Sequence, residues 1–188
     1  MKKIGKWKIL GSEYLYRRPW LTARRDCVEL PDGRVFDEFY ILEYPTWVNV
    51  IAITDEGKYV MVRQYRHGIG EVLTELCAGC AEPGENPMEA ARRELLEETG
   101  YAGGSWRAFD VLAPNASANT NLSHTFIAEG VTPVAEQQLD PSEDIAVELY
   151  TVDELLALLH SGAIKQTTMA APLWHHFYNL KTAKEERP

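Results

Sequence analysis

The chain has 188 residues, in which 19 Lys and Arg face 28 Asp and Glu, giving a formal net charge of -9. This length fits one main domain with appendages and excludes two full-sized domains. The net negative charge and the lack of a long basic run exclude a nucleic-acid-binding surface. No apolar stretch is long enough for a membrane span or a signal peptide. We therefore expect a cytoplasmic protein that binds neither nucleic acid nor membranes. If it acts on phosphates, a divalent cation held by carboxylates would supply the positive charge.

The cysteines, Cys27, Cys77 and Cys80, are three in number. An odd number suits a reducing compartment better than a disulfide framework. Cys77 and Cys80 have CxxC spacing, but no second pair follows to complete a structural zinc site. We therefore expect neither a disulfide nor bound zinc.

The N-terminal part of the chain contains two strand-like runs between Trp20 and Glu43, separated by the turn Pro31-Asp32-Gly33. Asp-Gly between such runs is a strong hairpin signal. A lone hairpin is marginal in water, and this one is rich in aromatic residues, so we expect it to be buried in a two-fold interface. Residues 1–43 are thus predicted to form a dimer-forming hairpin subdomain of a homodimer, ahead of a catalytic domain at residues 44–188.

The second part of the chain begins with another predicted hairpin, in which Trp47 to Thr54 and Lys58 to Gln64 flank Asp55-Glu56-Gly57. Helix starts are marked by Asn86-Pro87 and by the capping-box spacing of Thr151 and Glu154, while Gly100 and Gly162 are typical helix stops. Strand pairs followed by helices predict an α+β fold. The expected helices cover residues 86–100, 151–162 and 168–181. His175 and His176, in the last of them, are expected to have only a core or surface role.

The first predicted helix carries three glutamates, Glu94, Glu97 and Glu98, on one stripe. An adjoining stripe can pack on the sheet; it consists of Met88, Ala91, Leu95 and Thr99. Because the acidic stripe borders the core, partial desolvation strengthens the repulsion between its carboxylates and should destabilise the helix. A bound divalent cation would make the same arrangement stabilising. The alternative is a solvated helix in which Arg92 and Arg93 simply balance the glutamates.

The wider spacing decides between these two interpretations. Gly79 is followed after five residues by Glu85, and after seven more by the run Arg93-Glu94-Leu95-Leu96-Glu97-Glu98-Thr99-Gly100-Tyr101. This resembles the Nudix box, Gx5Ex7REUxEExGU, where U is bulky and apolar. Seven such identities would arise by chance in about one chain in a million at ordinary residue usage. The resemblance implies a Nudix fold, a mixed β-sheet sandwiched between helices, and hydrolysis of a diphosphate linkage.

Further segments resemble the ADP-ribose pyrophosphatase branch of the Nudix superfamily. They are Arg63-Gln64-Tyr65-Arg66, Thr74-Glu75-Leu76-Cys77-Ala78-Gly79 and Glu143-Asp144-Ile145. Two features depart from that branch, because Cys77 stands where proline is common and Pro114 comes slightly nearer to the box than the usual downstream proline. The chemistry is therefore predicted more firmly than the substrate.

The resemblance also implies roles for the residues of the box. Glu94 and Glu98 match the principal metal carboxylates, Glu97 a supplementary one, and Ala78 the residue whose backbone carbonyl joins the metal shell. The metal would be Mg²⁺, or alternatively Mn²⁺. Arg93 would orient a carboxylate. Glu85 is expected to fix the loop and the helix start, with metal binding as the alternative.

Outside the box, we expect a general base in the polar loop at residues 139–144 and favour Glu143, with Asp144 or Asp140 as alternatives. Arg66 matches an arginine that contacts substrate phosphate. Trp20 and Phe36 match aromatic positions that sandwich the adenine, one of them from the partner subunit; ordinary packing is the competing interpretation.

Three hypotheses for the function follow from this resemblance. The first is an enzyme that splits ADP-ribose into AMP and ribose 5-phosphate with magnesium. The second is a hydrolase of another nucleoside diphosphate sugar, such as GDP-mannose. The third is a Nudix-fold module that binds a nucleotide sugar without turnover, and the intact set of Arg93, Glu94, Glu97 and Glu98 argues against it.

Overall fold

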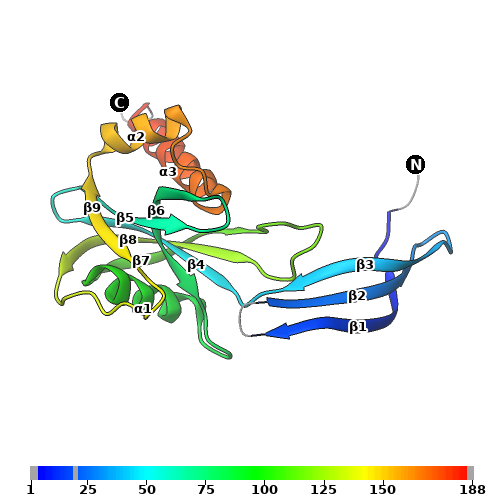
Figure 1. Ribbon diagram of the computed structural model, residues 1–188. Helices are drawn as coiled ribbons and strands as arrows, with labels where there is room; N and C mark the ends of the chain where they lie inside the picture. Colours follow the sequence, from blue (N-terminus) through cyan, green and yellow to red (C-terminus); the bar gives the residue numbers. More distant parts are fainter. Residues whose placement is uncertain (1–3, 19–20, 186–188) are drawn as a thin grey trace. The chain divides into compact units, whose positions relative to one another are not determined.

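A computed structural model describes residues 4–18 and 21–185. Its centre is a mixed sheet in the strand order β7-β8-β4-β6-β5-β9, in which β4 runs parallel to β8 and the other recorded pairs are antiparallel (Figure 1). The strands are β4 (Trp47–Thr54), β5 (Tyr59–Arg66), β6 (Glu71–Cys80), β7 (Tyr101–Leu112), β8 (Ser123–Pro133) and β9 (Ile145–Tyr150).

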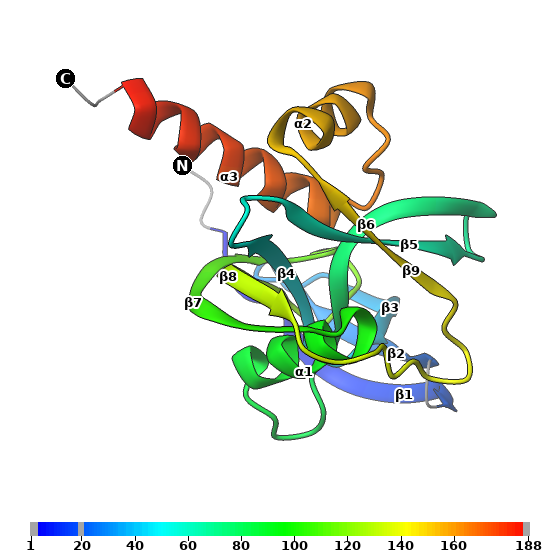
Figure 2. The ribbon, with the colours of Figure 1, turned by 90° about the vertical axis from the view of Figure 1, so that its left-hand side faces the viewer.

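Helices cover both faces of this sheet, with α1 (Pro87–Thr99) on one face and α2 (Val152–Ser161) and α3 (Thr167–Glu185) on the other (Figure 2). Each face has its own apolar core. Alternate residues of β4 explain this, because Val48 and Val50 pack toward α1 while Ile51 packs toward α2 and α3. The predicted α+β fold, with a mixed sheet between helices, is confirmed. None of the helices in the described ranges combines the length and apolar character that a membrane crossing requires.

The helix that carries the acidic stripe begins and ends at the predicted residues. The Asn86 side chain accepts a hydrogen bond of 2.9 Å from the Met88 N–H, and Pro87 occupies the first turn. Gly100 adopts a φ of 74° and donates its N–H to the Leu96 carbonyl, which ends the helix. The predicted capping box of Thr151 and Glu154 is present at the start of α2. The last helix is longer than predicted.

The N-terminal part of the chain forms a separate antiparallel sheet in the order β1-β2-β3. Strands β2 (Leu21–Glu29) and β3 (Val35–Glu43) are the predicted hairpin, and β1 (Lys8–Arg18) is an additional strand that the sequence analysis missed. All positions of β1 are exposed, and its pairing with β2 shifts register twice. The alternation that would have marked it as a strand is therefore absent.

Contacts group the chain into two units. One contains the residues up to Pro45 together with Ala113–Asn121, and the other contains Thr46–Leu112 and Leu122–Pro188. The second unit holds both apolar cores and the whole acidic helix, so the chemistry predicted for the box lies within it.

A buried histidine ties α3 to the sheet. His176 is 2% exposed, and one of its ring nitrogens lies 2.8 Å from the Tyr59 hydroxyl oxygen. Burial, assisted by the nearby positive charge of Arg107, lowers the pKa of His176 to about 4. His175, in contrast, is exposed and pairs with Asp110. The expectation of a core or surface role for the two residues agrees with these positions.

The first prediction concerns the stability of this core in acid. Between about pH 6.5 and pH 4 the unfolded chain binds a proton at His176 that the folded chain does not, so the free energy of unfolding should fall as the pH falls. The full difference is about 3 kcal/mol at pH 4. His176→Gln keeps a hydrogen-bonding partner for Tyr59 but does not titrate.

Urea unfolding at pH 7 and pH 4 measures the effect. The wild-type chain should lose more stability than the His176→Gln variant over this interval, by about 2 to 3 kcal/mol. An equal loss in the two proteins would contradict the assignment.

Candidate active site

The site predicted from the box is formed where α1 packs on the end of β6. Glu98 is only 3% exposed, and its carboxylate accepts a hydrogen bond of 3.1 Å from the Ala78 N–H. The Glu94 carboxylate occupies the place where residue 79 would otherwise carry a side chain, because a Cβ on Gly79 would lie 2.1 Å from Glu94 Cδ. A glycine at position 79 is therefore what lets the Glu94 carboxylate reach the strand.

Burial is the main electrostatic influence on these two carboxylates. It raises the pKa of Glu98 to about 7, against the opposing effect of its hydrogen bonds from Cys77 and from the Ala78 N–H. Burial also raises the pKa of Glu94, although the positive charge of Arg93 lowers it in part. The charge of Glu94 further raises the pKa of Glu98. The pair is thus held in a place where negative charge is unfavourable.

Arg93 is the cation that partly offsets this charge. It donates to Glu94 at 3.0 Å, to Glu97 at 2.9 Å and to Glu85 at 3.1 Å, and also to the carbonyl of Cys80 at 3.0 Å. These partners lie on α1, on β6 and in the loop between them, so a single guanidinium joins the three segments. Glu85 also accepts from the Glu82 N–H, which agrees with the expected role in fixing the loop. The side chain of Glu97 is 41% exposed, whereas that of Glu94 is 13% exposed.

The loop before β9 reaches the C-terminal end of α1. Gln137 donates its amide to the Glu98 carbonyl at 2.6 Å, and the Gln138 N–H donates to the Glu97 carbonyl at 2.8 Å. The negative charge of Glu143 is among the influences that raise the pKa of Glu98. Glu143 accepts a hydrogen bond from the Asp140 N–H at 2.9 Å. The structure therefore brings this predicted loop residue near the carboxylate pair.

Arg66 is paired with a carboxylate that the sequence analysis did not single out. Glu75 has no exposed side-chain surface, and it accepts hydrogen bonds from Arg66 Nη2 at 2.6 Å and from Gln64 at 3.3 Å. Neighbouring strands β5 and β6 place Arg66 opposite Glu71, with Glu75 four residues farther along β6. A sequence signal for Glu75 was present. Glu75 comes two residues before Cys77, so both side chains lie on the same face of the strand, which is buried.

The two predicted aromatic residues belong to the N-terminal part of the chain. Phe36 lies in β3, opposite Val28, and is 48% exposed. Trp20 lies outside the described residues. Their role as a platform for a base stays a prediction.

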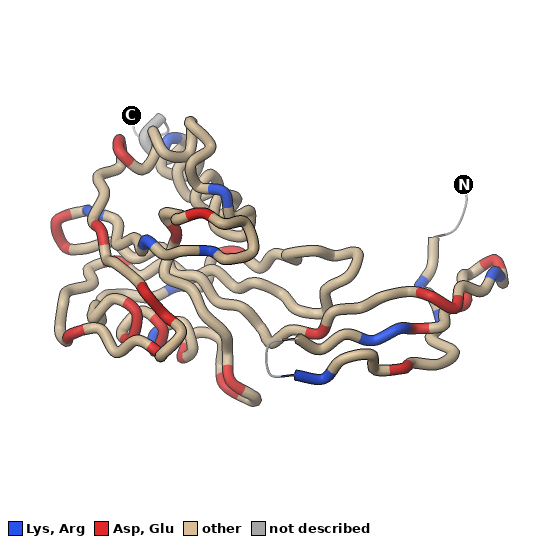
Figure 3. The backbone as a smooth tube through the Cα atoms, in the orientation of Figure 1, with Lys and Arg blue, Asp and Glu red and all other residues tan. Residues whose placement is uncertain are grey.

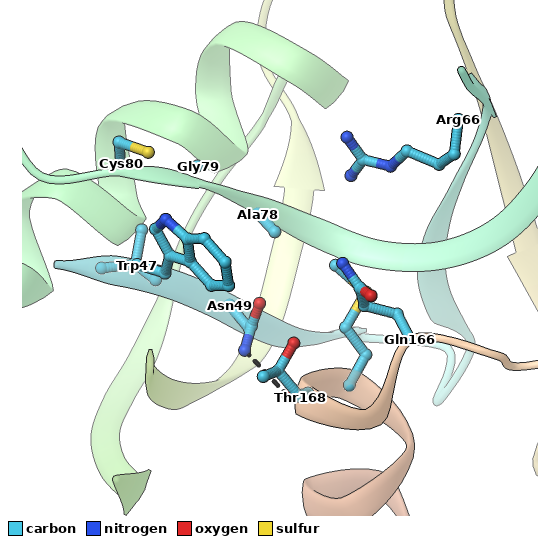
Figure 4. A pocket seen from close by; sticks show the side chains of 10 residues that line it. Trp47, Asn49, Arg66, Ala78, Gly79, Cys80, Gln166 and Thr168 are labelled. Atoms are coloured by element: carbon cyan, nitrogen blue, oxygen red, sulfur yellow. Dashed lines mark hydrogen bonds between the residues drawn. The ribbon is translucent and has the colours of Figure 1, made fainter. Parts of the chain in front are cut away.

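A cavity of about 180 Å³ lies at the end of β6 and was not anticipated (Figure 4). We call it the β6–α3 cavity, because Ala78 and Gly79 of β6 form one wall and the start of α3 forms another. It is lined by Trp47, Val48, Asn49, Arg66, Ala78, Gly79, Cys80, Gln166, Thr168 and Met169. Its lining residues come from four separate segments of the chain, so no local pattern in the sequence could predict it.

The donor set fits a hard divalent cation. Carboxylate and backbone oxygens are the ligands that Mg²⁺ and Mn²⁺ prefer, and Glu94, Glu98 and Ala78 bring such groups together on one strand end. The pKa values of Glu94 and Glu98 are raised by burial, so a cation bound between them would favour their ionised forms. In the part of the chain that the structure describes, no three His, Cys, Asp or Glu side chains already converge as a complete ligand cluster. Arg93 instead holds Glu94 and Glu97, and acidic residues are spread along α1 (Figure 3).

Comparisons with known proteins agree with this geometry. The NUDIX domain model matches residues 43–170, and a model described as the nucleoside diphosphate sugar hydrolase N-terminal domain matches residues 7–42. The ADP-ribose pyrophosphatase of Bacillus subtilis (strain 168) is 32% identical over 177 residues, which cover 94% of each chain. The methanol dehydrogenase activator of Bacillus methanolicus is 34% identical over 165 residues, covering 87% of this chain and 89% of that protein.

A solved structure shares the fold. The crystal structure of an ADP compounds hydrolase matches with a TM-score of 0.82 at 23% identity, covering 97% of this chain and 98% of that one. The fold and the site together define an enzyme that hydrolyses a diphosphate linkage. The chain belongs to the Nudix family and is a Nudix hydrolase, similar to ADP-ribose pyrophosphatases.

The second prediction tests the space that Gly79 leaves for Glu94. Gly79→Ala would force the Glu94 carboxylate to move, so we expect at least a tenfold loss of hydrolytic activity, in the range expected when a charged group is misplaced. The displaced atoms belong to a flexible side-chain end, so the fold should be kept. Gly68→Ala is the matched control, because a Cβ there meets nothing within 4 Å. The activity and the thermal unfolding of the two variants are to be compared. Equal activity would show that the close contact between residue 79 and the Glu94 carboxylate does not matter for hydrolysis.

Proposed function

We propose that the chain hydrolyses the diphosphate linkage of a nucleoside diphosphate sugar, and that ADP-ribose, split into AMP and ribose 5-phosphate, is its preferred substrate. The observation that carries the hydrolytic part is the buried pair of Glu94 and Glu98 against the end of β6. The sugar nucleotide class is supported by the N-terminal match over residues 7–42. The choice of ADP-ribose rests on similarity to proteins named ADP-ribose pyrophosphatase in Bacillus subtilis and Mycobacterium tuberculosis.

GDP-mannose and other nucleoside diphosphate sugars remain the alternative substrates, and a binding module without turnover is the alternative class. The contacts of Arg93 oppose the second alternative. A module that only binds has no need of an arginine that orients Glu94, Glu97 and Glu85 together. Release of phosphate-containing products from a panel of nucleotide sugars, with and without magnesium, separates these cases.

Glu94, Glu98 and the Ala78 carbonyl would hold the metal, with Glu97 as a supplementary ligand. Bound Mg²⁺, or Mn²⁺ in its place, supplies positive charge to the phosphate oxygens. Arg93 keeps Glu94 and Glu97 in position through the hydrogen bonds that it donates to both. Arg66, fixed by the buried Glu75, presents a guanidinium that can bind a phosphate oxygen.

Glu143 is our candidate for the general base. It accepts the proton of a water molecule whose oxygen forms a bond to phosphorus, while the bond between that phosphorus and the bridging oxygen breaks. The bridging oxygen leaves with the other phosphate. The negative charge of Glu143 is one of the influences that raise the pKa of Glu98, and this supports the choice. Asp140 and Asp144 remain the alternatives in the same loop.

The third prediction concerns Glu98. Glu98→Gln keeps the size of the side chain but removes a charge from the metal set, so activity should fall about a hundredfold or more. Glu89→Gln on the same helix is the control, because the Glu89 side chain is 67% exposed and pairs only loosely with Arg92. Initial rates at saturating magnesium provide the measurement. Near-normal turnover in the Glu98 variant would remove this residue from the metal site.

We further propose that the chain acts as a homodimer through its N-terminal sheet. Large apolar side chains are exposed on this sheet and directly before it, among them Trp7, Tyr16, Phe36 and Tyr40 at 46%, 61%, 48% and 52%. Such a surface is readily buried in a two-fold interface.

The fourth prediction follows from the dimer. Light scattering should give twice the chain mass of 21.3 kDa. If Trp20 stacks on the base, Trp20→Ala should raise KM for ADP-ribose roughly five- to a hundredfold with little change in kcat. A monomeric mass together with an unchanged KM would leave this sheet without the proposed role.

A further inference from the structure

The face of β6 that packs toward α1 carries a row of three residues in contact with the charged groups of the site. Alternate residues of a strand point to the same face, so Glu75, Cys77 and Gly79 lie in one row. Glu75 holds Arg66 at one end of the row, and Gly79 leaves room for Glu94 at the other. Cys77 lies between them, and the reaction proposed above gives it no role.

The Cys77 side chain is buried against Glu98. It has no exposed surface, and its thiol donates a hydrogen bond to the Glu98 carboxylate. The N–H of the next residue, Ala78, donates to the same carboxylate at 3.1 Å. Two consecutive residues of β6 therefore hold Glu98, one through its side chain and the other through its backbone.

The surroundings of this thiol keep its proton in place. Burial raises the pKa of Cys77 well above its usual value, and the negative charges of Glu98, Glu94 and Glu143 raise it further. The sulfur is therefore an S–H donor rather than a thiolate. A thiol is a weak donor, but its bond to an ionised acceptor in a buried place is stronger than a bond between neutral groups.

Two donors restrict a carboxylate more than one does. A single hydrogen bond fixes one oxygen and lets the carboxylate plane turn about it, whereas a second donor fixes the plane. An ionised carboxylate has about four lone-pair positions, so Glu98 keeps free positions for a cation after both bonds are made. Proline, which is common at position 77 in the related branch, has no side-chain donor. The thiol contact is therefore a feature of this chain.

We propose that Cys77 is a positioning residue of the metal site, whose thiol and the Ala78 N–H together hold the Glu98 carboxylate in the orientation that binds the cation. This inference rests on the proposed function, because it takes Glu98 as a metal ligand. Cys77 acts through Glu98 and is not itself a ligand. Loss of the thiol should therefore weaken cation binding without removing any ligand.

The infrared S–H stretching band tests the contact directly and needs no metal. The chain has three cysteines, so Cys77 supplies the only such band once Cys27→Ala and Cys80→Ala are made. In that chain Glu98→Gln replaces the carboxylate by a weaker acceptor, and the band should move to higher frequency. Glu89→Gln, at a side chain that is 67% exposed on the same helix, is the control and should leave the band in place. A band that does not respond to Glu98→Gln would overturn the inference.

Binding of Mn²⁺ without substrate tests the consequence for the metal site. Free Mn²⁺ is followed by its electron paramagnetic resonance signal in titrations of the wild-type chain and of Cys77→Ala, Cys77→Ser and Cys80→Ala. Alanine and serine both remove the sulfur, but only serine keeps a donor, so an effect of lost volume alone would be common to the two. Cys80→Ala is the matched control, because Cys80 lies three residues along β6 and lines the β6–α3 cavity.

The proposed role predicts a graded loss of cation affinity. Cys77→Ala should weaken Mn²⁺ binding about tenfold, as expected when a metal ligand loses a hydrogen-bonding partner. Cys77→Ser should bind Mn²⁺ more tightly than Cys77→Ala, and Cys80→Ala should bind it like the wild-type chain. Equal affinity in the wild-type chain and Cys77→Ala, or an equal loss in the alanine and serine variants, would overturn the inference and leave the metal site intact. A wild-type chain that binds no Mn²⁺ would contradict the proposed metal site, and the inference with it.

Discussion

The burial of the Glu98 carboxylate against the backbone of β6 is the constraint on which the site depends. A carboxylate that is only 3% exposed loses most of its hydration, and the single backbone donor of Ala78 replaces only part of it. The sheet and α1 must therefore meet closely at this point, and Gly79 makes the close approach possible by leaving room for Glu94. The precise caps of α1, Asn86 and Gly100, fix the length of the helix that delivers both carboxylates.

Arg93 and the loop before β9 hold the carboxylates in place but do not fully neutralise their negative charge. Arg93 connects Glu94, Glu97 and Glu85, which would otherwise repel one another. The loop is tied to the last carbonyls of α1 by Gln137 and Gln138, and it brings the additional negative charge of Glu143 near Glu98. The protein thus accepts unfavourable electrostatics at one point of a well-packed fold. Such a concentration of charge is typical of a functional site rather than of a purely structural one.

Local signals explain why much of the fold could be predicted from sequence. The caps of α1 and α2 and the hairpins of the two sheets follow from residues that are close along the chain, and those elements are confirmed. Strand β1 was missed because its residues are exposed and its register shifts twice. Within the site, the spacing of the box identified Glu94 and Glu98, but the pairing of Arg66 with Glu75 and the β6–α3 cavity arise from contacts between segments far apart in sequence. Periodicity within one segment carries no information about such contacts.

The central claim is that the buried carboxylates form an electrostatically costly site which a divalent cation stabilises. Thermal unfolding with increasing Mn²⁺ tests it most directly and needs no substrate. A cation that binds the folded chain at a hundred times its Kd should raise the unfolding midpoint of the wild-type chain by about 5 °C or more. The same titration of a variant in which both Glu94 and Glu98 are replaced by Gln should give almost no rise. An unchanged midpoint in the wild-type chain, or an equal rise in the two proteins, would contradict the account.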